Sequence, residues 1–426
     1  MAELIIEGGY PLSGIVTPIG NKNAALPLLA ATLLTDERIV LHNVPNIRDV
    51  QTMLDILADL GVQIERLSEH DLALQAQTIT KTSLDAELCS EIRASILFAG
   101  PMLARCGRVK LPPPGGDVIG RRRVDTHFQA FQKLGASVTI DGCYLIETRR
   151  LRGAFIFLDE ASVTGTENAV MAAVRAEGET IICNAAGEPH VQELCMFLNQ
   201  MGAQIEGIGS NKLVIRGVER LHSAEWTLGP DHIEVGSLIG LAATTGGELR
   251  IKNAGTQHLH MTRLMLNRLG VHIDYDGDDV LVPGGQELCV CADLDGAIPK
   301  IDDGPWPHFP ADMMSIALVV ATQSQGTVLI WEKMFESRLF FVDRLIGMGA
   351  KIVLCDPCRA VVIGPTRLHG APLVSPDIRA GMAMLIAALC AQGTSRISNI
   401  QQIDRGYERI EVKLQALGAH IKRVEC

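Results

Sequence analysis

The chain has 426 residues, of which 47% are hydrophobic and 20% are charged, a composition typical of a globular protein with more than one domain. Its formal net charge of -11 argues against a surface built to bind nucleic acid or an anionic membrane. Aromatic residues make up only 4%, which also disfavours the base-stacking platforms of single-strand binders.

The N-terminal segment and the cysteines bear on the compartment. MAELIIEGG lacks the basic start and apolar core of a signal peptide, and no apolar run reaches the ~20 residues that span a bilayer, so we expect a cytoplasmic protein without a membrane partner. The 11 cysteines are scattered and odd in number, which fits free thiols. Because Cys355 and Cys358 flank Asp-Pro and no second pair completes a zinc site, we expect a hairpin turn there and no bound metal.

A recurring pattern, leucine or methionine followed by glycine and then alanine or valine, divides the chain into six parts. It ends an amphipathic segment at Gly61, Gly135, Gly202, Gly270, Gly349 and Gly418, which lie 67 to 79 residues apart. This spacing exceeds the ~20 to 50 residues of common solenoid repeats, so each repeat is expected to be a small α/β unit. The glycine is typical of a helix C-cap, and we assign it no chemistry.

Each repeat has the same predicted order of elements. An apolar helix comes first, at residues 24–34, 94–104, 168–176, 313–322 and 381–391, and its apolar surface on nearly all sides predicts burial. A short strand that begins at glycine follows, at residues 178–184, 247–253, 326–332 and 393–399. An amphipathic helix, such as residues 50–61 or 191–202, then ends at the repeat's glycine, and one or two strands close the unit.

Three repeats in each half predict two similar α/β domains, with buried helices inside and strands and amphipathic helices outside. We place the first domain at residues 22–229 and the second at residues 1–21 plus 230–426, with residues 219–231 as the link. A cleft between two domains is the default place for a ligand.

The stretch LPPPGGDVIGRRRVDTH, residues 111–127, concentrates turn residues, a carboxylate and three arginines. Three prolines stiffen its approach and two glycines allow backbone angles closed to other residues, so Asp117 is expected at the tip of a movable loop. Arg121, Arg122 and Arg123 follow, and guanidinium groups match phosphate and carboxylate oxygens. A solvated basic loop is the alternative, because charge runs usually lie on exposed faces.

Polar residues also stand at the starts of the buried helices. Lys22 and Asn23 precede the first, Arg93 the second, Asp312 the fifth and Arg379 the sixth, while Arg405 follows the sixth repeat's first strand. In a sixfold arrangement such helix starts can converge on one cleft, where the helix amides add a positive field. The set suits a substrate with phosphate and carboxylate groups, and two carboxylates could transfer protons. The sequence has no Walker loop, HExxH or GxSxG motif, so kinase, zinc-protease and hydrolase functions lose their main support.

Seven separated segments together resemble the enolpyruvyl transferase family over essentially the whole chain: NKNAALP, EIRAS, the PGG loop with GRRRVDTH, SVTGTEN, PHFPADM, MFESR and IDRGYERIEVKLQALGA. The resemblance implies a two-domain inside-out α/β barrel, each domain built from three βαβαββ repeats, with the active site between them. It implies transfer of the enolpyruvyl group of phosphoenolpyruvate to the 3-hydroxyl of UDP-N-acetylglucosamine, with release of phosphate. The family reaction proceeds by addition and elimination through a tetrahedral ketal, needs no cofactor, and is the first committed step of peptidoglycan synthesis.

The resemblance also implies roles for individual residues. Asp117 matches the acid that protonates the enol ether carbon, and Asp312 matches the base that takes the proton of the sugar hydroxyl. The phosphoenolpyruvate positions match Lys22, Asn23, Arg122, Arg379 and Arg405, of which Lys22 and Arg405 also count as catalytic. The UDP-N-acetylglucosamine positions match Asn23, Arg93, Arg122, Arg123, Val124, Asp125, Thr126, Ser162, Val163, Asp312, Met334 and Phe335.

Three positions depart from the family pattern. Most members carry cysteine at the position of Asp117. An aspartate can still donate a proton, but it lacks the thiolate that fosfomycin alkylates, so we expect insensitivity to that drug. Arg123 replaces a usual proline and Glu160 stands where lysine is common, which alters the expected uridine contacts. The neighbouring arginines favour an ionised Asp117, so we expect it to act as an acid only when the loop closes over substrate.

Two alternatives stay open. The enzyme 5-enolpyruvylshikimate-3-phosphate synthase shares fold and donor, although the PGG loop with Asp117 and RRRVD favours the UDP-sugar acceptor. A catalytically silent paralogue that binds UDP-sugars is the second, although the retained proton-transfer groups speak against it. We expect a monomer or weak homo-oligomer with small-molecule substrates and no nucleic-acid partner. His127, close to the loop, is expected to be solvated, with ligand contact as the other interpretation.

Overall fold

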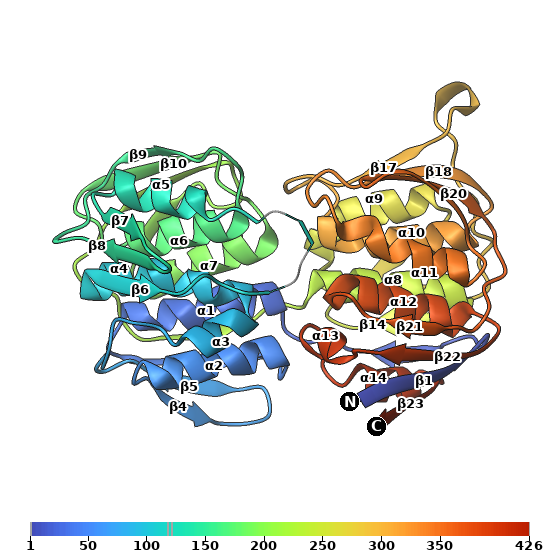
Figure 1. Cartoon of the computed structure of the whole chain (residues 1–426), viewed down its shortest axis with the longest axis horizontal. Helices are drawn as coiled ribbons and strands as arrows, with labels where there is room; N and C mark the ends of the chain where they lie inside the picture. Colours follow the sequence, from blue (N-terminus) through green and yellow to red (C-terminus); the bar gives the residue numbers. More distant parts are fainter. Residues whose placement is uncertain (1, 117–118, 121, 426) are drawn as a thin grey trace. The chain divides into compact units, whose positions relative to one another are not determined.

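The computed structural model describes residues 2–116, 119–120 and 122–425. It divides into two compact units: unit A comprises Gly20–Asp117 and Arg122–Gly229, and unit B comprises Met1–Ile19, Val118–Arg121 and Pro230–Cys426. Figure 1 labels the helices and strands of both units. Each unit combines helices with three small sheets, so the predicted α/β class is confirmed.

In unit A the apolar segments of the three repeats form the buried helices. These are α1 (Lys22–Ala31) with η1 (Thr32–Leu34), η2 (Arg93–Phe98) with α4 (Ala99–Cys106), and α6 (Val163–Ala173). The amphipathic segments form the outer helices α2 (Arg48–Asp59), α3 (Ala86–Glu91), α5 (Asp125–Lys133) and α7 (Pro189–Gln200). Helix α6 packs on α4 and on α5, so the apolar segments make a common core.

Three sheets enclose this core, one for each repeat. Their strand orders are β13 (Ala224–Thr227), β3 (Arg38–His42), β5 (Leu72–Gln75) and β4 (Gln63–Arg66); β6 (Arg108–Leu111), β8 (Tyr144–Glu147) and β7 (Ser137–Ile140); and β11 (Gln204–Glu206), β12 (Lys212–Arg216), β10 (Glu179–Cys183) and β9 (Phe155–Phe157). Strands β13 and β9 pair in parallel with β3 and β10, and the other ladders are antiparallel. The buried helix α6 lies between β9 and β10 in the chain, as in a βαβ crossover.

Unit B repeats this plan. Its buried helices are α8 (His232–Thr245), η5 (Ala311–Met313) with α10 (Met314–Gln323), and α12 (Ile378–Cys390). Shorter helices surround them: η3 (Thr256–His258), α9 (His260–Arg268), η4 (Leu294–Gly296), η6 (Arg338–Phe341), α11 (Val342–Gly347), α13 (Gln401–Asp404) and α14 (Ile410–Ala416).

The three sheets of unit B have the same mixture of ladders. Their strand orders are β2 (Gly14–Val16), β14 (Leu249–Ile251), β16 (Asp279–Val282) and β15 (Asp274–Asp276); β17 (Lys300–Asp302), β18 (Gly326–Trp331), β20 (Arg359–Gly364) and β19 (Lys351–Asp356); and β21 (Pro372–Val374), β22 (Gly393–Ser398), β1 (Ala2–Gly8) and β23 (His420–Glu425). In each, the first strand is parallel to the second and the remaining pairs are antiparallel.

Strands distant in sequence complete three of the six sheets. The segment 219–231, which we expected to be only a link, contains β13, and β13 pairs with β3 at the other end of unit A. In unit B the N-terminal strands β1 and β2 enter the sheets of the sixth and fourth repeats. In each unit these strands connect the last repeat to the first. The pairings are between residues far apart in sequence, so local sequence patterns cannot predict them.

The six repeat glycines end their helices as predicted. All six have positive φ, from 84° to 105°. At Gly61 the glycine N–H donates to the Ala58 carbonyl and the next N–H, of Val62, donates to the Leu57 carbonyl, which is the Schellman pattern. Equivalent pairs of bonds occur at the other five glycines, so the C-cap interpretation of the repeat is confirmed.

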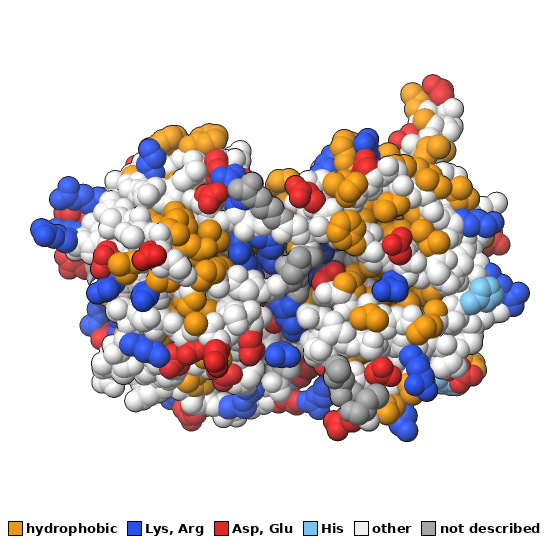
Figure 2. Space-filling view, viewed as in Figure 1, with side chains coloured by type: hydrophobic (Ala, Val, Ile, Leu, Met, Phe, Trp, Pro, Cys, Tyr) orange, Lys and Arg blue, Asp and Glu red, His pale blue; other side chains and the backbone are white. Residues whose placement is uncertain are grey.

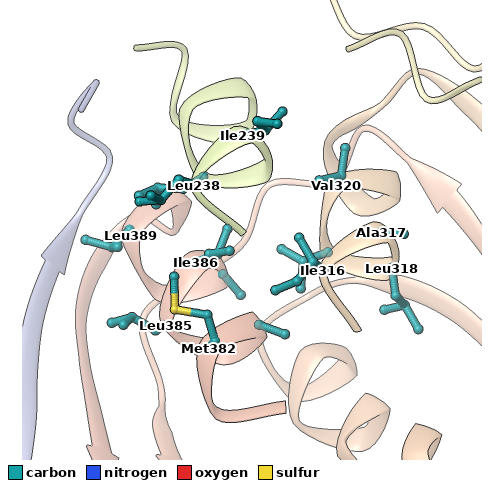
Figure 3. Packing of buried hydrophobic residues seen from close by; sticks show 14 of the residues in the cluster. Leu238, Ile239, Ile316, Ala317, Leu318, Val320, Met382, Leu385, Ile386 and Leu389 are labelled. Atoms are coloured by element: carbon teal, nitrogen blue, oxygen red, sulfur yellow. The ribbon is translucent and has the colours of Figure 1, made fainter. Parts of the chain in front are cut away.

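Helices α8, α10 and α12 pack against one another in the centre of unit B. Figure 3 shows Leu238 and Ile239 of α8 close to the α10 and α12 side chains. Gly236 and Gly240 let these helices approach, because an added Cβ would lie 2.5 Å from Met313 Cε and 2.7 Å from Ile316 Cγ2. The helices pack closely because glycine occupies these two contact positions. The prediction of buried helices is confirmed.

The outer surface has no single sign of charge on the face that Figure 2 presents, where acidic and basic side chains are interspersed on each unit. An arm between β16 and β17 projects from unit B (Figure 1), and Leu294, in η4 of this segment, is 87% exposed. Cys355 and Cys358 lie at the β19–β20 connection, so the expected hairpin is confirmed. Within the described ranges, no helix has both the length and the apolar character required to cross a bilayer.

Candidate functional site

Asp312 lies at the centre of an ion-pair network in unit B. Its Oδ1 accepts a hydrogen bond from Arg338 Nη2 at 2.9 Å, and its Oδ2 accepts from Arg379 Nε and Nη2, both at 2.9 Å. The arginine side chains are 3% and 7% exposed, whereas the carboxylate is 28% exposed. Two buried guanidinium groups therefore fix a carboxylate whose open edge can still meet a ligand.

Arg379 is itself held on several sides at the start of α12. Its N–H is capped by Asp377 Oδ1 at 2.8 Å, and its Nη1 donates to the Tyr407 hydroxyl at 3.2 Å, which lies 3.1 Å from Ser237 Oγ. Burial alone would lower the pKa of Arg379, but the charge of Asp312 and the contact with Tyr407 raise it above its usual value. The guanidinium stays charged and has little freedom to move.

The start of α8 meets the same network. Asp231 caps α8 by accepting the N–H groups of Ile233 and Glu234 at 2.9 and 3.1 Å. Burial lowers the pKa of His232 to about 4, and His232 also senses the charges of Arg379 and Asp312. The starts of α8, α10 and α12 thus converge in unit B, as expected for equivalent positions of a repeat.

The loop after β18 contributes the apolar side of the network. Met334 is 38% exposed, and the Arg338 guanidinium carbon lies 5.0 Å from the centre of the Phe335 ring, in cation–π geometry. Arg405 is 9% exposed at the C-terminal end of α13, where its Nη1 donates to Gln402 Oε1 at 3.0 Å.

In unit A, Lys22 forms a buried ion pair. Helix α1 begins at Lys22, two residues earlier than predicted, because Asn21 caps it by accepting the N–H of Asn23 at 2.9 Å. Lys22 Nζ lies 2.7 Å from Asp49 Oδ2, and the two side chains are 7% and 5% exposed. A lysine before a helix is usually solvated, so this burial distinguishes Lys22 from a surface residue.

Arg93 holds the backbone of the arginine stretch. Its Nη2 donates to the carbonyl oxygens of Arg122 and Arg123 at 2.7 and 3.0 Å. Burial, and then the charge of Arg122, lower the pKa of Arg93 to about 10. The glycines of the PGG loop are needed nearby, since a Cβ on Gly115 would lie 1.7 Å from the Ser90 carbonyl oxygen and one on Gly116 2.8 Å from Arg93 Cβ.

The starts of α5 and α6 gather the remaining candidates of unit A. Arg123 pairs with Asp125 at 3.0 Å and with Asp159 at 2.6 Å, and these bonds raise its pKa. Thr126 Oγ1 donates to Asp159 Oδ1 at 2.9 Å and lies 3.4 Å from Glu160 Oε1. Val124 occupies the N-cap position of α5 without a side-chain hydrogen bond. Ser162 caps α6 by accepting the N–H of Gly165 at 3.2 Å, and Val163 is the first residue of α6.

His127 differs from our expectation of a solvated loop residue. It is 1% exposed in α5, its Nδ1 accepts from Asn168 Nδ2 at 2.9 Å, and its Nε2 lies 3.2 Å from Thr164 Oγ1. Burial, helped by the charge of Arg93, lowers the pKa of His127 to about 3. The histidine is a neutral structural link between α5 and α6.

Sequence reasoning therefore found clusters but missed several partners. In unit B it named Asp312 and Arg379, which are in contact, but gave no role to Arg338 or Tyr407, although both lie in segments of the family resemblance. In unit A it missed Asp49 and Asp159, for which single-chain patterns carry no specific signal. Asp117 and Arg121 lie outside the described residues.

Comparison with known proteins gives a family for these clusters. Residues 6–414 match the family model described as EPSP synthase (3-phosphoshikimate 1-carboxyvinyltransferase). A UDP-N-acetylglucosamine 1-carboxyvinyltransferase of Bradyrhizobium diazoefficiens is 57% identical over 422 residues, covering 99% of this chain and 98% of the relative. The enzyme of the same name from Treponema denticola is 55% identical over 425 residues and covers all of both chains.

Solved structures agree on the fold. The enolpyruvyl transferase NikO from Streptomyces tendae superposes with a TM-score of 0.88 at 24% identity, covering 100% of this chain and 99% of its own. An EPSP synthase from Acinetobacter baumannii superposes with a TM-score of 0.76 at 15% identity over the full length of both chains. The two-domain α/β fold expected from the sequence is confirmed. The chain belongs to the EPSP synthase family of enolpyruvyl transferases.

Proposed function

We propose that the protein transfers the enolpyruvyl group of phosphoenolpyruvate to the 3-hydroxyl of UDP-N-acetylglucosamine and releases phosphate. The observation that carries this proposal is full-length identity of 55 to 57% with relatives named UDP-N-acetylglucosamine 1-carboxyvinyltransferase. The sister reaction, with shikimate 3-phosphate as acceptor, has the weaker claim. The family model is described by the name of the enzyme that catalyses this sister reaction, EPSP synthase. The solved EPSP synthase structures, however, are only 15 and 16% identical to this chain.

Asp312 is the proton acceptor in this proposal. The sugar hydroxyl must lose its proton while its oxygen bonds to C2 of phosphoenolpyruvate. A carboxylate that is held by Arg338 and Arg379 and is 28% exposed can accept that proton without first reorienting. Arg379 and Arg338 also offset the negative charge that collects around the donor.

Asp117 is the proton donor. Its proton goes to C3 of phosphoenolpyruvate, which leaves C2 open to the sugar oxygen and gives a tetrahedral ketal. Loss of a C3 proton and departure of phosphate then restore the enol ether. Lys22, Asn23, Arg122, Arg379 and Arg405 bind the phosphate and carboxylate of the donor, for which ammonium and guanidinium groups are the matching partners.

The UDP-sugar is assigned to residues of both units. Asn23, Arg93, Arg122 to Thr126, Ser162 and Val163 from unit A, and Asp312, Met334 and Phe335 from unit B, are the proposed contacts. The starts of α5 and α6 support this assignment, because helix N-terminal amides favour a diphosphate. Arg123 is engaged by Asp125 and Asp159, so a diphosphate would have to compete with two carboxylates for it.

Several wider expectations follow from the same proposal. Residues 22–229 and residues 1–21 plus 230–426 form the two three-repeat domains. The product feeds peptidoglycan synthesis, and hence cell-wall biogenesis, cell shape and division, in the cytoplasm. Neither metal nor cofactor takes part, the protein works as a monomer or weak homo-oligomer, and Asp117 makes it insensitive to fosfomycin.

Phosphate release tests the proposal. Purified protein with phosphoenolpyruvate is given UDP-N-acetylglucosamine or shikimate 3-phosphate, and phosphate is measured for wild type, Asp117→Ala and Asp141→Ala. Asp141 is an exposed residue of the β7–β8 turn and serves as the matched control. Release with the UDP-sugar alone, lost in Asp117→Ala and kept in Asp141→Ala, is expected.

Other outcomes would separate the alternatives. Release with shikimate 3-phosphate instead would assign the sister reaction. Tight binding of the UDP-sugar without release from either acceptor would make the protein a silent binder. Loss of activity after incubation with fosfomycin would contradict the assignment of a non-thiol acid at the loop tip.

A further inference from the structure

The fifth repeat departs from four of the other repeats at one position, just after its central strand. Four repeats place asparagine there, at Asn43, Asn184, Asn253 and Asn399, each with positive φ from 48° to 58°. The fifth repeat places Glu332 there, after β18, and Glu332 is 0% exposed.

In three repeats the asparagine has a defined partner. Its side-chain amide donates to the carbonyl oxygen of the residue that follows the parallel first strand: Asn43 to Leu228 at 2.9 Å, Asn184 to Leu158 at 2.9 Å and Asn399 to Ser375 at 2.6 Å. The register makes Asp303 the equivalent partner of Glu332, since Asp302 pairs with Trp331. A neutral amide bridge is thus replaced by two facing carboxyl groups, and Asp303 is only 1% exposed.

These carboxyl groups hold the loop that carries Met334 and Phe335. Asp303 accepts the N–H of Lys333 at 2.5 Å and that of Met334 at 3.3 Å, while Glu332 Oε1 accepts the N–H of Phe335 at 3.1 Å. Three successive amides of the loop therefore end on this pair. Both loop residues assigned to the UDP-sugar depend on it for their position.

Glu332 also reaches the Asp312 network. Its Oε2 lies 3.7 Å from Arg338 Nε and has no hydrogen-bond donor among the described residues. Among the residues that the structure describes, Arg338 Nε and Nη1 have no hydrogen-bond acceptor, while Arg338 Nη2 donates to Asp312. An ionised Glu332 would place a second buried carboxylate beside Arg338 and attract Arg338 away from Asp312, whereas a protonated Glu332 carries no charge that could do so.

We propose that Glu332 and Asp303 share one proton and act as a positioning pair, which keeps Arg338 on Asp312 and the Met334–Phe335 loop in its binding conformation. The role in catalysis rests on the proposed function. In this pair Asp303 accepts the loop amides, and Glu332 stays neutral beside Arg338.

The surroundings of Glu332 agree with this assignment. The groups that face it are Asp303 after β17, Arg338 on η6 and Cys358 at the β19–β20 turn. Burial, together with a hydrogen bond to Asp303, raises the pKa of Glu332 to about 9, although Arg338 acts in the opposite direction. Above that pH both carboxylates would be charged, and Arg338 would be divided between Glu332 and Asp312.

The test compares Glu332→Gln with wild type, using Glu336→Gln as the matched control. Glutamine has the shape of the protonated acid, and Glu336 is an exposed residue of the same loop. Wild type should lose kcat/KM for the UDP-sugar with a midpoint near pH 9. Glu332→Gln should stay within about threefold of wild type at pH 7 but move that midpoint up by at least about one pH unit. Glu336→Gln should keep the wild-type profile.

Asp303→Asn supplies the opposite perturbation. With asparagine beside it, Glu332 can ionise and compete for Arg338, and the loop amides lose a charged acceptor. The KM for the UDP-sugar at pH 7 should rise about tenfold while kcat falls less, because loop position is disturbed before the chemistry. An unchanged KM would overturn the loop role of the pair.

Thermal unfolding gives a readout that does not need the proposed reaction. When folding raises the pKa of a carboxyl group, its protonation stabilises the folded chain fully at pH values below the pKa of the unfolded state. That stability is lost as pH rises toward the folded-state pKa of about 9. The unfolding temperature of Glu332→Gln, relative to that of wild type, should therefore rise steadily from pH 6 to pH 9. A constant difference, or an alkaline activity limb unchanged in Glu332→Gln, would overturn the shared proton. A growing difference in a protein that shows no turnover would refute the proposed function and leave the pair established.

Discussion

The arginines of the two units are held in different ways. In unit B, Arg338 and Arg379 are 3% and 7% exposed and both converge on Asp312. In unit A, Arg123 and its partner Asp159 are each 34% exposed, and Asp125 is 53% exposed. Exposed pairs contribute only about 0 to 1 kcal/mol, so Arg123 can exchange its carboxylates for a ligand at little cost.

The comparison suggests a division of labour within the proposed reaction. Unit B presents a preformed carboxylate whose orientation does not depend on ligand, which suits a proton acceptor. Unit A presents Arg123, which can change partner and so suits the capture of a diphosphate. Lys22, buried against Asp49, is the exception in unit A and gives it one fixed charge.

The largest expected effect comes from removing an arginine of unit B. Arg379→Met should lower kcat/KM by about 10²- to 10³-fold, because Asp312 loses two hydrogen bonds and the donor loses a cation. Arg379→Lys should recover only part of this, since one ammonium cannot reproduce the fork. Steady-state kinetics decide, with Arg396→Met on the exposed side of β22 as control. Full recovery of kcat/KM by Arg379→Lys would contradict the role of the fork.

Lys22→Met tests the fixed charge of unit A. The substitution leaves Asp49 buried without its cation and should lower the free energy of unfolding by about 3 to 5 kcal/mol. The double variant Lys22→Met/Asp49→Leu should recover most of this stability. Lys81→Met is the matched control, because its pair with Asp59 is 40% and 33% exposed. Urea unfolding that showed the same loss for both lysines would contradict a buried pair.

His127→Gln tests the link between α5 and α6. Because the folded pKa of His127 is about 3, below its ordinary value of 6.5, its contribution is complete above 6.5 and is lost as pH falls toward 3. Wild type should thus lose about 2 kcal/mol relative to the variant between pH 7 and pH 5. Urea unfolding at both values measures this, with exposed His222→Gln as control. A difference that does not change with pH would mean that His127 protonates freely.

The smallest effects distinguish the repeat glycines. Gly418→Ala in unit B meets only backbone strain, since no atom lies within 4 Å of the added Cβ, and should cost about 1 to 2 kcal/mol. Gly61→Ala in unit A has the same strain and also places Cβ 2.7 Å from Thr80 Cγ2, so it should cost more. Thermal unfolding that ranked the two the other way would contradict the packing described around Gly61.

Sequence alone predicted the parts of the fold that depend on local patterns. The six glycines, the apolar helices and the strands that begin at glycine were readable because capping, burial and alternation act over a few residues. Strand β13 and the N-terminal strands β1 and β2 were not predicted in their sheets, because their partners lie far away in sequence. Pairing across a unit depends on the completed fold.

The site was predictable to a similar degree. Family segments pointed to Asp312 and Arg379, but a buried partner such as Asp49 is recognisable only from coordinates. Glu332 did leave a signal that repeat alignment could have found: the strands IICN, RIKN and RISN end in asparagine, whereas LIWE ends in glutamate. His127 was misjudged because burial of a loop-adjacent histidine depends on the packing of α5 on α6.

The most direct test of Asp312 as proton acceptor is single-turnover phosphate release by wild type and Asp312→Asn, with UDP-N-acetylglucosamine binding measured by calorimetry on the same samples. The variant should bind the UDP-sugar within about tenfold of wild type but release phosphate about 10² to 10⁴ times more slowly. Equal rates in the two proteins would contradict the role of Asp312 as proton acceptor.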